Sequence, residues 1–324
     1  MRLIGLAVAL TVGLILAPLA AEAQEAGKVY RVGILWLGPD PAPSNPFFDV
    51  FRQSLGDSGY FEGTNLSFSH RWGRPERLRD LATELVRLKV DVLFAGHSPA
   101  IRAVSEATTT IPIVVISVGD PVEAGLVTSL ARPGGNITGL SGRVQELNEK
   151  LLELLKEITP SASRVAVLGS RISVGLHRQG MEVAARSLGV RLQFLEVTSL
   201  TELDAAFETA AKARAEGLVL LPTPLLTFNE KRIAALALQR RLPAIFWRSQ
   251  FPEAGGLMAY GPDLAYVWRR AGALVARILK GARPADLPVE QADRFRLVIN
   301  MKTAKALGLT IPQSVLGRAD QVIE

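Results

Sequence analysis

The sequence predicts an α/β protein of two lobes, each a parallel sheet wound on both faces by helices. Short, continuous apolar runs alternate with amphipathic helical periods, which is the pattern of parallel strands buried on both faces. The chain has 324 residues, too many for one ordinary domain and suited to two of about 150 residues each. The pattern also restarts part-way along the chain. These observations together predict two doubly wound lobes joined by hinge crossings, with a ligand cleft between them.

The first set of elements precedes residue 120. Leu78, Leu81, Leu85 and Leu88 recur at helical spacing, with Pro75 at the start of the run. Short apolar or alternating runs bounded by Gly or Pro are expected to be strands. The expected strands are 30–38, 65–72, 90–96 and 111–119, and the expected helices are 45–60, 75–89 and 98–108.

The second set repeats this alternation. The expected helices are 145–160, 174–189, 200–215 and 228–241, and the expected strands are 164–170, 191–197, 217–223 and 243–249. Right-handed crossovers would wind each set into its own sheet.

Three crossings between the lobes are expected: near Asn136–Ser141, near Gly255–Gly261, and in the tail at 294–316. The expected division assigns residues 29–139 with about 261–285 to lobe 1. It assigns residues 140–260 with about 286–324 to lobe 2.

The first 23 residues read as a secretory signal peptide. A positive start, Met1-Arg2, precedes an apolar run that Pro18 interrupts, and small residues, Ala21 and Ala23, occupy the −3 and −1 positions of a cleavage site. We therefore expect cleavage after Ala23 and a soluble, monomeric, periplasmic protein. The alternative is an uncleaved anchor, because the run is near spanning length.

Composition excludes several function classes. The chain has no cysteine, which excludes disulfides, thiolate metal sites and a thiol nucleophile. Its net charge of +6 is scattered, without a basic run interleaved with aromatics, so no nucleic-acid partner is expected. Phosphate-binding glycine loops, GxSxG and HExxH are missing, and the three histidines lack metal-ligand spacing. No catalytic residue, metal or cofactor is therefore expected.

Polar residues follow two of the expected strands in the first half. His97, Ser98, Pro99 and Ala100 follow one, and Gly119, Asp120 and Pro121 follow the next. Ligands bind at the carboxyl ends of parallel strands, so these tips are candidate binding residues.

Each tip has a ligand-binding and a structural interpretation. Ser98 would cap the helix, and the free N–H groups of its first turn would hold a carboxylate; otherwise Ser98 is a cap only. Asp120 would pair with a ligand ammonium group, or would be the N-cap of a short helical run after it. His97 would contact ligand or lie at the surface.

The remaining candidates occupy similar positions. Trp36, near the end of the first strand, would stack on a flat ligand or would serve as a core or lid residue. The candidates in the second half are Ser170, Arg171, Thr223, Pro224, Ser249 and Gln250, with Tyr260 near the second crossing.

Four segments resemble a known family: "GYFEGTNL", "RPERLRDLATELVRLKVDV", "TTTIPIVVISVGDPVEAGLVTSLARPGGNITGLS" and "FRLVINMKTAKALGLTIP". The chain resembles the substrate-binding components of ABC transporters with the type I periplasmic-binding fold, in the branch linked with aromatic or branched amino acid uptake. The resemblance implies that 97–100 and 119–121 hold a ligand's head group from lobe 1. Ser170, Thr223 and Ser249 would complete the site from lobe 2. His97 is bulkier than the residue expected at its position.

The resulting hypothesis is a secreted solute-binding protein that performs no chemistry. It would deliver a small molecule, an amino acid by resemblance, to the membrane subunits of an ABC permease. A ligand-sensing subunit that docks on a membrane receptor kinase would share the same fold. A nicotinamide-dependent oxidoreductase is a third possibility, but the chain lacks the phosphate-binding loop that such an enzyme needs.

Overall fold

The computed structural model describes residues 27–38, 46–117, 119–142 and 144–324. The predicted signal peptide and its cleavage site after Ala23 lie outside the described residues, as does Val118 at the end of an expected strand. Among the described residues, no helix combines the length and apolar character needed to cross a membrane.

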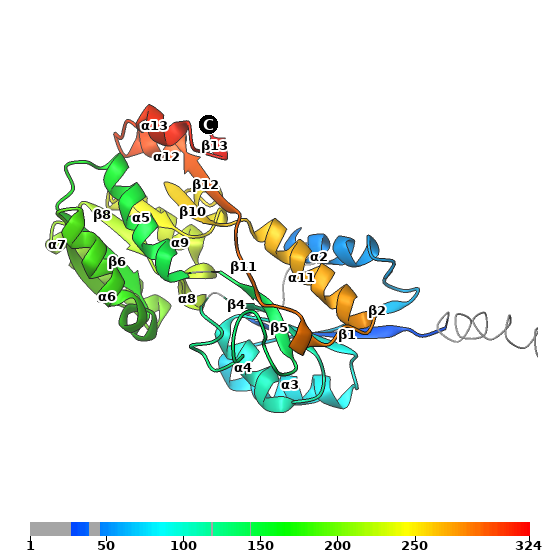
Figure 1. Cartoon of the computed structure of the whole chain (residues 1–324). Coiled ribbons are helices and arrows are strands. Elements are labelled where there is room, and N and C mark those ends of the chain that lie inside the picture. Colours follow the sequence, from blue (N-terminus) through cyan, green and yellow to red (C-terminus); the bar gives the residue numbers. More distant parts are fainter. Residues whose placement is uncertain (1–26, 39–45, 118, 143) are drawn as a thin grey trace, which may run out of the picture.

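The chain forms two lobes, each built on one sheet (Figure 1). The lobe 1 sheet is parallel throughout, in the order β11-β5-β4-β3-β1-β2. Its strands are β1 (Tyr30–Leu37), β2 (Leu66–Gly73), β3 (Val92–Gly96), β4 (Ile113–Ser117), β5 (Ile137–Ser141) and β11 (Glu290–Gln291). Its helical segments are α2 (Pro46–Gly56), η1 (Pro75–Arg77), α3 (Leu78–Arg87), α4 (Ser98–Ala107), α11 (Leu264–Leu279) and η3 (Pro284–Asp286).

The lobe 2 sheet has the order β13-β12-β10-β9-β8-β6-β7. Its strands are β6 (Arg164–Gly169), β7 (Arg191–Glu196), β8 (Gly217–Leu220), β9 (Ala244–Phe246), β10 (Met258–Pro262), β12 (Phe295–Asn300) and β13 (Gln321–Ile323). Its helical segments are α5 (Val144–Ile158), α6 (Arg171–Ser187), η2 (Leu200–Glu202), α7 (Leu203–Lys212), α8 (Pro224–Thr227), α9 (Glu230–Gln239), α10 (Gln250–Glu253), α12 (Met301–Ala306) and α13 (Gln313–Leu316).

The predicted fold class is confirmed, with one departure from a purely parallel arrangement. β12 pairs antiparallel with β10, whereas the other pairings in this sheet are parallel. The chain leaves lobe 2 after β10 and returns after β11, and the returning strand β12 runs in the opposite direction to its neighbour β10.

The crossings between the lobes come later in the chain than expected. All of β5, to Ser141, belongs to the lobe 1 sheet, so the first crossing is not at residues 139–140. β10 is an inner strand of lobe 2, and the second crossing follows Pro262 rather than lying in Gly255–Gly261. The third lies between β11 and β12 and not near residue 286, because Glu290 and Gln291 still pair with β5.

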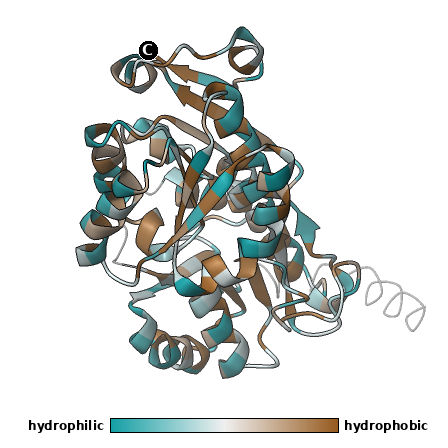
Figure 2. Ribbon diagram, turned by 90° about the vertical axis from the view of Figure 1, so that its left-hand side faces the viewer, coloured by the Kyte–Doolittle hydropathy of each residue, from teal (hydrophilic) through white to brown (hydrophobic). Residues whose placement is uncertain are grey.

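Strand β1 shows why the lobe 1 sheet is apolar on both faces. Ile34 and Trp36 pack in the cluster formed with α2 and α11, whereas Leu35 and Leu37 pack in the cluster formed with α3 and α4. Successive side chains of a strand point to opposite faces, so a sheet covered on both sides needs continuous apolar strands. Hydrophobic residues accordingly concentrate in the central strands (Figure 2).

Candidate functional site

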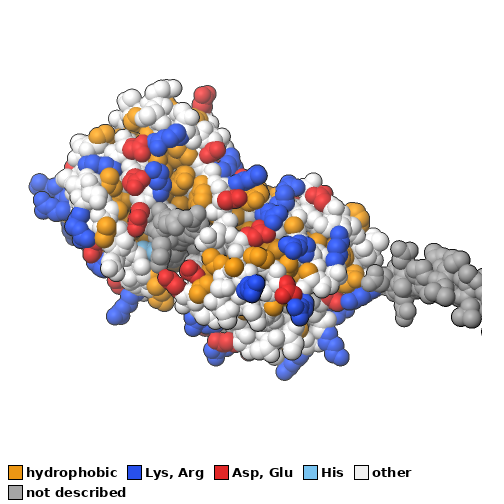
Figure 3. All heavy atoms as spheres, viewed as in Figure 1, with side chains coloured by type: hydrophobic (Ala, Val, Ile, Leu, Met, Phe, Trp, Pro, Cys, Tyr) orange, Lys and Arg blue, Asp and Glu red, His pale blue; other side chains and the backbone are white. Residues whose placement is uncertain are grey.

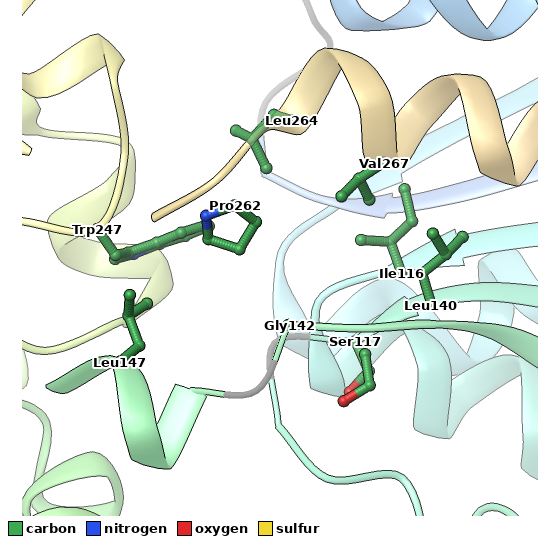
Figure 4. A pocket seen from close by; sticks show the side chains of 10 residues that line it. Ile116, Ser117, Leu140, Gly142, Leu147, Trp247, Pro262, Leu264 and Val267 are labelled. Carbon is green, nitrogen blue, oxygen red and sulfur yellow. The ribbon is translucent and has the colours of Figure 1, made fainter. Parts of the chain in front are cut away.

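A pocket lies where the two lobes meet beside the crossings (Figure 4). About 390 Å³ of space, part of it open to solvent, separates its walls. The lining residues come from the ends of β4, β5, β9 and β10 and from α5 and α11: Ile116, Ser117, Leu140, Ser141, Gly142, Leu147, Trp247, Pro262, Leu264 and Val267. Most of these side chains are apolar, so the pocket suits an apolar group.

Two serines form the polar part of the wall. The hydroxyls of Ser117 and Ser141 donate to the carbonyl oxygen of Gly119, at 3.0 and 3.2 Å. These bonds tie the tip of β4 to the end of β5. They fix the backbone at Gly119, immediately before Asp120.

None of the predicted site residues lines this pocket, but several lie beside it. Gly119, Ser249 and Tyr260 each stand two positions from a lining residue. The predicted residues and the pocket thus both lie near the carboxyl ends of strands. The sequence did not single out the lining residues because most of them are apolar residues of strand ends and helices, indistinguishable from core residues by pattern.

Trp36 is a core residue of lobe 1. Its side chain is 8% exposed and packs against Trp268, Phe94 and Trp72, with ring centroids 4.8–6.0 Å away. A Cβ atom on Gly96 would lie 2.1 Å from the Trp36 ring, so the indole lies directly on the backbone of β3. This position matches the core alternative rather than stacking on a ligand.

Helix α4 starts differently from the prediction. It begins at Ser98, and its N-cap is His97, which has φ of 68° and makes no side-chain capping bond. The prediction that Ser98 caps the helix is therefore wrong. Ser98 is exposed, Pro99 lies in the first turn and Ala100 is buried. A positive φ is costly for a residue with a Cβ, so the fold holds His97 in a strained conformation.

His97 lies between the lobes. Its ring packs edge-on to Trp36 at 5.4 Å and lies 5.7 Å from Phe228 of lobe 2. Burial, with a smaller contribution from the positive charge of Arg248, lowers the pKa of His97 to about 4. His97 is therefore neutral near pH 7, and its buried Nδ1 has no hydrogen-bond partner among the described residues.

Asp120 closes a turn and does not cap a helix. Its Oδ1 accepts from the backbone N–H groups of Val122 and Glu123, at 2.7 and 3.3 Å. The short helix expected after it is wrong, because residues 121–125 form turns. Asp120 is exposed and Pro121 is buried. The second oxygen, Oδ2, has no partner among the described residues.

The side chains of two predicted lobe 2 residues cap the start of helices. Ser170 forms a capping box with Ser173 at the start of α6, where Arg171 is exposed. Thr223 accepts from the N–H of Leu226 at 3.1 Å, and Pro224 is the first residue of α8.

The other lobe 2 candidates differ in the contacts that their side chains make. Gln250 donates to Ser249 Oγ at 3.2 Å, and its buried Oε1 has no partner within the described part of the chain. Tyr260 stacks on Phe295, with ring centroids 5.7 Å apart. Gln250 thus retains an unused acceptor, whereas Tyr260 packs on its own lobe.

An ion pair that the sequence did not reveal lies in lobe 2. Arg248 Nε donates to Glu230 Oε1 at 2.8 Å, and both side chains are largely buried. Arg248 precedes the predicted Ser249, so the same strand-tip argument would have included it. Its partner Glu230 lies 18 positions away in the sequence, so no local pattern predicted the pair. Among the described residues, no group of His, Asp or Glu side chains could hold a metal ion.

Comparison with known proteins matches the chain to proteins that bind small molecules. A family model for ABC transporter substrate binding proteins matches residues 47–323. The tyrosine-binding protein of Clostridioides difficile is 28% identical over 263 residues, which cover 80% of this chain and 75% of that protein.

Solved structures extend this similarity. A domain from Streptococcus pneumoniae in complex with L-tryptophan is 25% identical, with a TM-score of 0.80, and covers 91% of this chain and 100% of its own. The ligand-free, open structure of a Clostridium difficile substrate-binding protein with adhesive properties is also 25% identical, with a TM-score of 0.70, over 91% and 99%. The glucose-galactose binding protein of Geobacillus stearothermophilus shares the fold at 15% identity, with a TM-score of 0.60, over 84% and 98%.

Proposed function

The chain belongs to the family of ABC transporter substrate-binding proteins, and from that premise we propose that it binds an amino acid in the interlobe cleft and delivers it to a membrane permease. The observation that carries the proposal is the apolar pocket built from both lobes at the crossings. It would accept an apolar side chain. Relatives similar over most of the chain bind tyrosine or tryptophan, which supports an aromatic ligand.

The tips of β3 and β4 would hold the head group of the ligand. They belong to adjacent parallel strands, which lie about 4.8 Å apart. The first turn of α4 offers backbone N–H groups to a carboxylate, and Asp120 offers a negative charge to an ammonium group. An α-amino acid carries both groups within this distance.

The lobes adopt an arrangement that we interpret as closed. At equal identity, the chain superposes better on the tryptophan complex than on the open, ligand-free structure. Phe228 of lobe 2 also contacts Gly38 and His97 of lobe 1. Both observations support a cleft that closes on its ligand.

A thermal-shift screen of the L-amino acids, followed by calorimetric titration, tests this function. A ligand at 100 times its Kd should raise the free energy of unfolding by about 2.7 kcal/mol. If no amino acid shifts the unfolding transition or binds in the calorimeter, the amino acid assignment is wrong.

Export to the periplasm is part of the proposal, on the evidence of residues 1–23. Mass spectrometry of the protein from its native host should find Gln24 at the amino terminus. A retained Met1 in the membrane fraction would contradict it.

A further inference from the structure

Arg248 stands at the edge of the pocket, held by two neighbours. It follows Trp247, which lines the pocket, and its guanidinium carbon lies 5.5 Å from the Trp247 ring centroid. On another side, Nε donates to Glu230 at 2.8 Å. An ion pair and a cation–π contact together restrict the guanidinium group to one position.

Most of the donors of Arg248 make no hydrogen bond to the described residues. A guanidinium group carries five N–H donors, of which the bond to Glu230 uses one. Within the described part of the chain, Nη1 and Nη2 have no hydrogen-bond partner, although the side chain is only 20% exposed. Neither atom is among the fully buried side-chain atoms without a partner, so both are open to solvent and can bind an incoming anion.

Glu230 compensates the charge of Arg248 incompletely. The Glu230 side chain is 10% exposed, and burial raises its pKa to about 7 against the opposing effect of Arg248. Near neutral pH, part of the population therefore has a protonated Glu230 beside a charged guanidinium group. The local charge is then positive.

The start of α4 in lobe 1 has the same preference for an anion. The charge of Arg248 reaches His97 of lobe 1, which stays neutral at pH 7. His97 immediately precedes α4, and the first turn of that helix presents backbone N–H groups and the positive end of the helix dipole. Arg248 is thus close enough to His97 to affect its titration, and both Arg248 and the first turn of α4 favour a negative charge.

We propose that Arg248 binds the carboxylate of the ligand from lobe 2, opposite the start of α4, and that the ligands of this protein are therefore carboxylic acids. The inference rests on the proposed function and specifies the chemical class recognised at that site. A planar guanidinium group with two free NH₂ groups can hold a carboxylate through two parallel bonds. Glu230 acts as a positioning residue that sets the orientation of the Arg248 guanidinium group.

The test compares acids with the corresponding amines that lack the carboxylate. Wild type and Arg248→Gln are titrated calorimetrically with L-tyrosine, L-tryptophan, tyramine and tryptamine. We expect the variant to bind the acids roughly 10- to 100-fold more weakly, the usual effect of losing charge-assisted hydrogen bonds, with no further loss for the amines. Arg232→Gln is the matched control, since Arg232 lies on α9 and pairs with Asp204 outside the pocket. It should bind like wild type.

Folding and binding are separated by a second variant. Arg248→Gln leaves Glu230 buried without its partner, so thermal unfolding is measured in parallel. The double variant Arg248→Gln/Glu230→Gln has no unpaired buried charge and should lose affinity for the acids to the same extent.

Two results would overturn the inference: equal affinity of wild type and the double variant for the acids, or wild type binding the amines as tightly as the acids. If wild type binds neither series and no other L-amino acid binds in the screen, the amino acid assignment itself fails. Titration of wild type and Arg248→Gln with 3-phenylpropionate and succinate then tests whether Arg248 binds a carboxylate. Binding that is lost in Arg248→Gln supports its role, and no binding to wild type refutes it.

Discussion

Oδ2 of Asp120 has no partner among the residues that the structure describes, whereas Oδ1 accepts the two backbone bonds of its turn. If Oδ2 meets the ligand ammonium group, Asp120→Asn should cost roughly 1.5–3 kcal/mol of amino acid affinity. Stability should change by no more than about 1 kcal/mol, since an asparagine oxygen can accept the same turn bonds. The affinity for 3-(4-hydroxyphenyl)propionate, which lacks the amine, should not change. Equal calorimetric affinities for tyrosine would reduce Asp120 to a turn residue.

Glu230 should make stability depend on pH. Burial raises its folded-state pKa from 4.5 to about 7, so the folded state binds the proton more tightly than the unfolded state between these values. The free energy of unfolding should therefore fall as pH rises through this window, by up to about 3 kcal/mol from this group. Glu230→Gln should remove the contribution. Urea unfolding at pH 5 and pH 7.5 measures it, and an identical pH difference in both proteins would contradict it.

A glycine-to-alanine substitution should have opposite effects in strand β3 and in helix α6, because the two glycines differ in the space around them. A Cβ atom on Gly96 would lie 2.1 Å from the Trp36 ring, whereas one on Gly175 of α6 would have no heavy atom within 4 Å. Gly96→Ala must displace a packed indole and should cost about 1–3 kcal/mol. Gly175→Ala should stabilise the protein by about 0.5–1 kcal/mol, because alanine favours a helix interior. Urea unfolding of both variants checks the signs, and destabilisation by both would show that the α6 site is more crowded than described.

At the scale of the whole molecule, Phe228 links the lobes. It is 45% exposed, yet its ring carbon lies 2.7 Å from where a Cβ on Gly38 would be, and that glycine has φ of 124°. Phe228→Ala should favour opening and weaken ligand binding by about 1 kcal/mol, the scale of a half-buried aromatic ring.

Small-angle scattering with and without ligand measures the opening. Wild type should become more compact on binding, and ligand-free Phe228→Ala should have a larger radius of gyration than ligand-free wild type. Ile172→Ala is the control, since Ile172 is 76% exposed on α6. A Phe228→Ala protein that matches wild type in affinity and radius would make the contact incidental.

The distribution of charged side chains over the surface agrees with the scattered charges of the sequence. On the face shown in Figure 3, basic and acidic side chains are spread over both lobes without a patch of one sign. The scattered charge of the sequence therefore appears on this face as interspersed basic and acidic side chains.

The sequence by itself determined the types and order of the elements and the division into two lobes. Periodicity reports which faces of a segment are buried, and most of the expected strands and helices match the structure within a few residues. The sequence could not show that Asp120 closes a turn or that His97, not Ser98, precedes α4, because similar polar residues begin turns and helices.

Only the tertiary structure decided which residues line the pocket between the lobes. Leu264 and Val267 of α11 meet Ile116 in one pocket, although about 150 positions separate them in the chain. Arg248 finds Glu230 on another element, and Phe228 finds Gly38 on another lobe. Local patterns record burial but not the partner, because the partner of a buried side chain is set by how the packed elements and lobes are placed relative to one another.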